Sequence, residues 1–169
     1  MSPGKPPSDA DAILHVVVGP DEHGVVRHGD AVATACGDRV LRLPEPRPLT
    51  ADEVGCARVL HVPWTDRLFG RRCEEATAAF ASLTGPWLDR GLSLSVTLHD
   101  LPVGDSPLEQ RRRAAYRGVV ERATGVVVSS WRELELVQEL SVTARSLRCI
   151  PLPVTAPRAP AVTTVATPP

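Results

Sequence analysis

Residues 92–129 read LSLSVTLHDLPVGDSPLEQRRRAAYRGVVERATGVVVS, and their pattern is the clearest indication of the fold class. Residues 92–98 and 125–129 are short apolar runs typical of buried strands. Between them the segment Ser106–Glu109 supplies an N-cap serine, a proline at the first helical position and a glutamate at the third, which predicts a helix. A strand, a helix and a strand in this order indicate a right-handed β-α-β crossover in a parallel sheet.

The same alternation continues on both sides of this unit. Further strands are expected at residues 13–18, 39–43, 58–62 and 147–150. Helices are expected along the apolar stripe from Phe69 to Leu83, which Gly85-Pro86 should end, and from Ser130 to Leu140. In the helix after Pro107, the expected inner positions are Leu108, Ala115, Val119 and Ala123. The whole pattern predicts an α/β fold: a Rossmann-like, doubly wound, mostly parallel six-stranded sheet with helices on both faces.

Length and composition narrow the function classes. With 169 residues, 43% of them hydrophobic and 23% charged, the chain suits one globular core. The net charge of -1 gives no indication of a nucleic-acid partner. Residues 1–11 are polar and proline-rich and predict a disordered N-terminus, residues 12–153 the folded domain, and residues 154–169 a proline-rich linker or tail. Without a signal-type segment, we expect a cytoplasmic protein with at most peripheral contact with the inner membrane face.

Metal binding and disulfides are not expected. The cysteines lack any C-x-x-C spacing, so we expect buried free thiols at Cys36, Cys56, Cys73 and Cys149. His15, His61 and His99 are spread along different strands, which argues against a shared metal site. The run Arg111–Arg113 spans too much of a helix to form one face, so a solvated surface is expected rather than a membrane-binding one.

Ligands of doubly wound sheets bind beyond the carboxyl ends of the strands, so the residues that follow strands are the candidates. After the first strand come His23, Gly24 and Val25, where a glycine lets a ligand approach the backbone and helix amides favour an anion. The fingerprint G-x-G-x-x-G is absent there, and a tight structural turn explains the loop about as well.

Three later strands also end in candidate residues. Trp64 could stack on a sugar, and Asp66 could accept hydrogen bonds from its hydroxyl groups. An indole of Trp64 packed on the sheet edge is an equally good interpretation. The pair His99-Asp100 is the strongest single candidate, because it stands where ligand-facing residues belong. Ser129 and Ser130 complete the set, with helix capping as the favoured role of their hydroxyls.

Taken in order, these segments resemble the retaining glycosyltransferases of the GT-B type, and more narrowly the family-4-like group. The segments that carry the resemblance are His61–Thr65, Val96–Asp100, Tyr116 on a helix, Val126–Ser130 and Ile150–Val154. The likeness spans Ile13 to Val154. It implies that this chain is half of a GT-B fold, the N-terminal, acceptor-side domain.

The resemblance also implies roles. His23, Gly24 and Val25 match the family's Gly-Gly loop beside the donor diphosphate, with His23 in place of the first glycine. His99 matches the active-site histidine beside the donor sugar, and Asp100 its neighbour. We expect His99 to act electrostatically and by positioning, not as a general base.

The resemblance further implies acceptor-side residues and partners. Ser129 and Ser130 match the strand end that lines the acceptor cleft. The partners would be a nucleotide-sugar donor, a sugar or lipid acceptor and a C-terminal Rossmann-like domain in cis or trans, with no cofactor or metal.

Nothing after Pro153 matches the second domain that holds most of the nucleotide-sugar site in that family. The chain alone should therefore lack most of its donor affinity and be inactive. A stand-alone, non-catalytic domain that binds a glycan or a protein is the alternative. An exposed apolar rim on the cleft would favour the half-enzyme, and a fully polar rim the binding domain. A hydrolase is less favoured, because neither G-x-S-x-G nor H-E-x-x-H is present.

Overall fold

The structure is a computed structural model that describes residues 12–140, 142 and 144–152; the expectations for residues 1–11 and 154–169 lie outside this part of the chain. Within it, parallel strands form one sheet in the order β2-β1-β3-β4-β5-β6. The strands are β1 (Ile13–Val18), β2 (Arg39–Leu43), β3 (Val59–Trp64), β4 (Ser93–Leu98), β5 (Gly125–Val128) and β6 (Leu147–Cys149). The helices are α1 (Gly24–Cys36), α2 (Ala51–Val54), α3 (Asp66–Phe69), α4 (Cys73–Leu88), α5 (Pro107–Arg122) and α6 (Trp131–Glu139).

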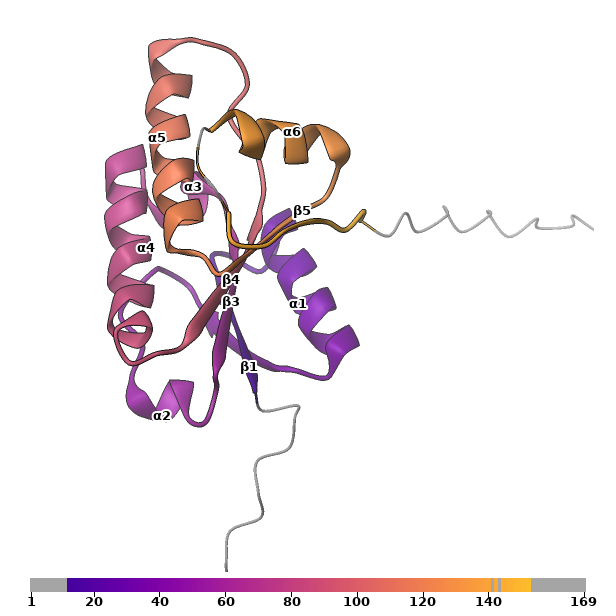
Figure 1. Cartoon of the computed structure of the whole chain (residues 1–169). Helices are drawn as coiled ribbons and strands as arrows, with labels where there is room; N and C mark the ends of the chain where they lie inside the picture. The colour runs from indigo at the N-terminus through magenta and orange to yellow at the C-terminus, as the bar shows by residue number, and fades with distance from the viewer. Residues whose placement is uncertain (1–11, 141, 143, 153–169) are drawn as a thin grey trace, which may run out of the picture.

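This arrangement confirms the predicted doubly wound α/β fold. Helix α1 lies on one side of the sheet, while α4 and α5 lie on the other (Figure 1). The strand order reverses at β1, which has β2 on one side and β3 on the other. The carboxyl ends of β1 and β3 therefore form the topological switch point, where sheets of this type bind ligands.

One face of the sheet carries the main apolar core. In β4, Leu94, Val96 and Leu98 are fully buried, and they belong to the same cluster as the apolar side chains of α4 and α5. Trp64 joins this core: its ring lies 4.5 Å from that of Tyr116 and 6.1 Å from that of Phe80, centroid to centroid. Such edge-to-face contacts between buried aromatic rings stabilise the packing of helices on the sheet.

Three helix details differ from the sequence-based expectation. Phe69 ends α3, and α4 begins only at Cys73. Helix α4 does not end at Gly85-Pro86 but continues to Leu88. The last turn persists because Trp87 is buried in the core, and the chain leaves the helix near Gly91, whose φ of 89° suits glycine. In α5, Leu108 is 52% exposed, because it lies in the first turn of the helix, whose buried residues begin at Ala115.

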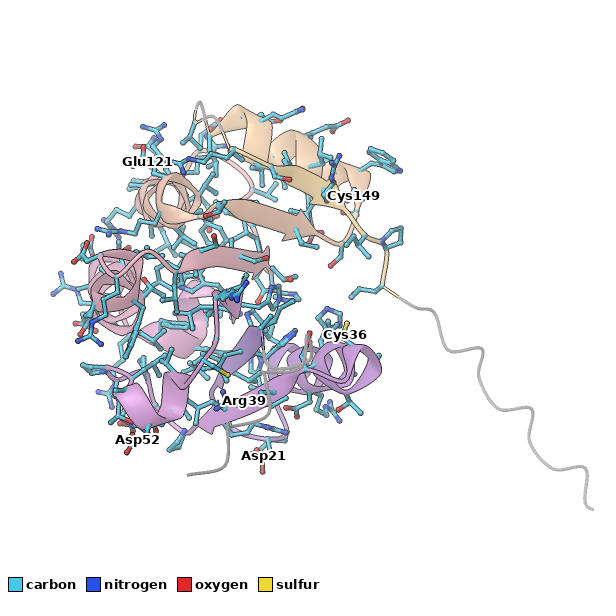
Figure 2. All side chains as sticks on the ribbon, turned by 60° about the horizontal axis from the view of Figure 1, so that its bottom comes forward. Asp21, Cys36, Arg39, Asp52, Glu121 and Cys149 are labelled. Atoms are coloured by element: carbon cyan, nitrogen blue, oxygen red, sulfur yellow. The ribbon has the colours of Figure 1, made fainter. Side chains whose placement is uncertain are left out.

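The four cysteines are free, but the prediction that all are buried is wrong. Cys73 is buried against the core, Cys149 is half-buried, and Cys36 and Cys56 are exposed. Figure 2 shows Cys36 on α1 and Cys149 on the edge strand β6, so these thiols stand on separate elements. Among the described residues, no helix combines the length and apolar character needed to cross a bilayer.

Candidate functional site

A cavity of about 530 Å³ opens at the carboxyl end of the sheet. It is formed by the start of α1, the ends of β4 and β5, the first turn of α6 and the segment after β6, and Figure 1 shows the start of α1 close to β5 and α6. Six residues expected at the site line this one cavity: His23, Gly24, Val25, His99, Asp100 and Ser129. We call it the carboxyl-edge cavity.

The start of α1 presents open backbone to this cavity. His23 is the N-cap residue, and its Nδ1 accepts a hydrogen bond from the amide of Val25 at 3.2 Å. Gly24 is the first helical residue, and a Cβ built on it would meet no atom within 4 Å. Packing therefore does not require glycine at position 24. The vacant side-chain position instead leaves room for a ligand beside the N-terminal amides of the helix.

The turn after β4 holds His99 and Asp100 in a defined conformation. Asp100 has a φ of 53°, the left-handed region that aspartate tolerates better than most residues. Behind the turn, the hydroxyl of Tyr116 lies 2.5 Å from the carbonyl oxygen of His99 and 3.1 Å from that of Asp100. Burial raises the pKa of Tyr116, so its phenol keeps the proton that it donates to these carbonyls.

A buried ion pair braces the same turn from further back. Arg112 donates from Nε to Oδ2 of Asp66 at 2.9 Å and from Nη2 to Oδ1 at 3.1 Å, a bidentate arrangement. Nη2 also donates to the carbonyl of Asp100. Thr65 adds a hydrogen bond from its hydroxyl to the Asp100 carboxylate at 3.2 Å. The side chains of Arg112 and Asp66 are 11% and 9% exposed, so Arg112 does not belong to the solvated surface expected of the arginine run.

The imidazole of His99 is neutral at pH 7. Burial lowers its pKa to about 4, and the nearby His28 contributes in the same direction. The two rings lie edge to face with centroids 5.4 Å apart. The Nε2 atom of His99 is enclosed and has no hydrogen-bond partner among the described residues. The site thus offers a neutral imidazole whose hydrogen-bonding capacity is not fully used, at the rim of an open cavity.

A polar network continues from the cavity into the sheet. His61 is held between the hydroxyls of Ser95, 3.0 Å from Nδ1, and Thr97, 3.1 Å from Nε2. Its ring lies 4.8 Å from that of His15, which in turn binds Asp38 at 2.9 Å. Burial lowers the pKa of His61 to about 4, with further lowering by His15 and His28. No group of three or more histidine, cysteine or acidic side chains within the described ranges is arranged to hold a metal ion.

Two residues proposed as acceptor contacts lie elsewhere. Of the two interpretations of Trp64, exposure at the rim is wrong: its side chain is fully buried among Phe69, Phe80 and Tyr116, because β3 turns this position toward the main core, so the indole packs against the sheet. Asp66 is also buried, and both of its carboxylate oxygens accept from Arg112. Neither side chain is available to a sugar in this conformation.

The two serines after β5 have different positions. Ser130 caps α6, where its hydroxyl accepts from the amide of Glu133 at 3.2 Å, which confirms the predicted cap. Ser129 lines the cavity, and its amide donates to the Glu133 carboxylate at 2.7 Å. Glu133 therefore fixes the strand end while presenting negative charge to the cavity.

Three lining residues were not anticipated: His28, Glu133 and Leu152. A signal existed for His28, because it follows Gly24 by four positions and so lies on the same face of α1. Glu133 lies in the first turn of α6, where helix capping by itself accounts for an acidic residue. Leu152 follows the last strand in an irregular segment, for which no periodicity can indicate a direction.

The comparisons with known proteins provide no relative for this site. No family model, curated protein sequence or solved structure matches the chain.

Proposed function

We propose that this chain is the acceptor-side domain of a retaining GT-B glycosyltransferase, which transfers a sugar from a nucleotide-sugar donor to a sugar or lipid acceptor. One observation carries the proposal: segments far apart in the sequence, at residues 23–25, 99–100 and 129, line a single cavity at the carboxyl edge of the sheet. These are segments to which the family resemblance assigns the donor and acceptor cleft. A second Rossmann-like domain, in cis or in trans, supplies most of the nucleotide site.

Each segment has a role that its chemistry supports. The exposed backbone at Gly24 and the N-terminal amides of α1 face the departing diphosphate, where partial positive charge stabilises negative charge. His99 contacts the donor sugar as a neutral dipole, and its enclosed Nε2 gains a partner when a sugar hydroxyl or a closing domain reaches it. With a pKa of about 4, His99 is too weak a base at pH 7 to remove a hydroxyl proton.

The rim of the cleft favours the half-enzyme over the stand-alone binding domain. Leu152 lines the carboxyl-edge cavity and is 46% exposed. Ile150, which is 59% exposed, and Trp131, which is 72% exposed, follow β6 and β5 at the same end of the sheet. A rim with large exposed apolar side chains suits a second domain that closes over the cleft.

The test is calorimetric titration of the chain with UDP-, GDP- and ADP-glucose, alone and mixed with a Rossmann-like nucleotide-sugar domain encoded beside it. We expect little heat from the chain alone, and binding with sugar transfer once the second domain is present. NMR of the product should show the donor's anomeric configuration retained. Absence of binding both with and without the second domain would assign the chain to the alternative, a non-catalytic domain that binds a glycan or a protein.

A matched pair of variants locates the chemistry. His99→Ala should lower turnover by about a hundredfold, the usual loss when one preorganised polar group is removed from a transition state. His61→Gln is the control, because His61 is held by Ser95 and Thr97 and does not line the cavity. Equal losses in both variants would show that His99 acts only through the fold.

A further inference from the structure

A second cavity, of about 440 Å³, lies between α3, the start of α4 and the start of α5. It shares no lining residue with the carboxyl-edge cavity. Five arginines line it: Arg67, Arg71, Arg72, Arg111 and Arg112. We call it the arginine pocket.

The charges around this pocket do not cancel. Three acidic residues line it, Asp66, Glu74 and Glu109, against the five arginines. Two of the three are engaged by Arg112, since Asp66 binds it bidentately and Glu109 lies 3.2 Å from its Nη1. Two of the three negative charges at the pocket are therefore paired with a single arginine, Arg112.

The other four arginines are left without counter-charges. Within the described part of the chain, no carboxylate lies within 4.0 Å of the guanidinium groups of Arg67, Arg71, Arg72 or Arg111, and no hydrogen bond is recorded for these side chains. By contrast, Arg113 of the same run pairs with Asp105 at 3.1 Å and does not line the pocket. These four arginines are exposed, so water screens their mutual repulsion, but their positive charges around one cavity still favour an anion there.

The backbone at the pocket adds to this potential. Helix α4 begins there, with Arg72 as its N-cap residue and no side chain capping its first amides. Gly70 allows the chain to pass this close, because a Cβ at that position would lie 2.7 Å from the amide nitrogen of Ala76. The positive end of a 16-residue helix and four arginines without an ion-pair partner thus line the same pocket.

We propose that the arginine pocket binds a phosphate-bearing ligand with at least two negative charges. Guanidinium groups match phosphate oxygens bidentately, and several of them in one site call for an anion of more than one charge. A volume of about 440 Å³ accommodates a phosphorylated small molecule or the phosphate end of a larger one. The phosphate could belong to a soluble ester or to a lipid headgroup, and the experiment below separates the two.

Calorimetric titration of the 169-residue chain with inorganic pyrophosphate at low and moderate salt tests the pocket directly. We expect saturable binding that weakens as salt rises. The double variant Arg71→Gln/Arg111→Gln should weaken it by at least about tenfold, while Arg113→Gln should change it by less than about twofold. Arg71 and Arg111 are exposed and Arg113 is paired elsewhere, so thermal unfolding should show that all the variants fold.

The source of the phosphate follows from a sedimentation assay with vesicles. Co-sedimentation with phosphatidylglycerol vesicles but not phosphatidylcholine vesicles, reversed by pyrophosphate, would assign the pocket to a lipid headgroup. Pyrophosphate binding without co-sedimentation would assign it to a soluble ligand. Absence of pyrophosphate binding, or an equal loss in Arg113→Gln and the double variant, would overturn the proposal. Because the two cavities share no residues, this result does not depend on the glycosyltransferase assay.

Discussion

The two faces of the sheet use the same strands for different purposes. In β3 and β4, the positions facing α4 and α5 carry Leu60, Trp64 and Leu98, which are fully buried and apolar. The positions between them on the other face carry His61 and Thr97, joined by hydrogen bonds. Successive side chains of a strand point to opposite faces, so each strand contributes to an apolar core on one face and to a polar layer on the other.

The polar layer leads toward the candidate site, whereas the apolar face does not. His15 and His61 lie in register on β1 and β3, and His28 of α1 lies near both His61 and the cavity residue His99. Stability and the polar chemistry near the cavity are therefore divided between the two faces of the sheet. Substitutions on the apolar face should mainly lower the free energy of unfolding, and those on the polar face should mainly change how that free energy depends on pH.

The largest effect is expected on the apolar face. Trp64→Ala removes a fully buried side chain that contacts three other aromatic rings, so the free energy of unfolding should fall by about 3–5 kcal/mol. Urea titration followed by circular dichroism measures it. Thr97→Val on the polar face is the comparison and should cost far less, because it removes only one hydrogen bond. Similar losses in both variants would contradict the division between the faces.

A smaller loss is expected where α1 meets the polar face. A Cβ at Gly29 would lie 2.8 Å from Cγ of Pro63 and 3.1 Å from Cγ2 of Val17, so Gly29→Ala forces the helix away from the sheet. The expected cost is about 1–3 kcal/mol, as for overpacking in general. Thermal unfolding would show the change. An unaltered melting temperature would mean that α1 shifts freely on this face.

The pH response of stability should come from the polar face. The pKa of His61 is about 4 when folded and about 6.5 in a free chain, so below pH 6.5 the unfolded state binds more protons. The stabilisation is complete above pH 6.5 and is lost as pH falls toward 4. His61→Gln keeps polar atoms near Ser95 and Thr97, but its side chain cannot titrate. The free energy of unfolding of the variant should therefore fall less steeply over this range, and its slope should differ from that of the wild type by up to about 1.4 kcal/mol per pH unit.

The measurement is a set of urea titrations at pH 8, 6 and 5 on both proteins. At pH 8 His61 is neutral in both states, so any difference between wild type and variant there reports packing alone. The gap should change in favour of the variant as pH falls. Parallel pH profiles would show that His61 is not the group that loses its proton on folding.

What the sequence predicted follows the same division. The strands and the fold class were predictable because continuous apolar runs and capping residues are local signals, and the edge strand β2 was among those predicted. The burial of Trp64 was not predictable, because the last residue of a strand and the first residue after it look alike in sequence. The Asp66–Arg112 pair joins positions 46 residues apart, and no local pattern encodes such a partner.

The sequence predicted that these segments meet at one edge of the sheet, because the carboxyl ends of parallel strands share that edge, and in the structure they line one cavity. It could not indicate which side chains at those ends turn outward. The orientation of the side chains after β4 depends on the hydrogen bonds that Tyr116 and Arg112 donate to the carbonyl of Asp100. These bonds form only when α5 packs on the sheet.

The smallest effect on stability is expected at Gly24, the counterpart of Gly29 in the same helix. Its Cβ would meet nothing within 4 Å, so Gly24→Ala should leave the free energy of unfolding unchanged within about 0.5 kcal/mol, or raise it slightly through better helix propensity. The added methyl group nevertheless enters the carboxyl-edge cavity beside the first amides of α1. With the second domain present, donor binding should therefore weaken in Gly24→Ala, as measured by calorimetry. Unchanged affinity of Gly24→Ala for every nucleotide-sugar would contradict the placement of the diphosphate beside this loop. The variant would then be stable and would bind the donor fully although its methyl group occupies the proposed approach to the helix amides.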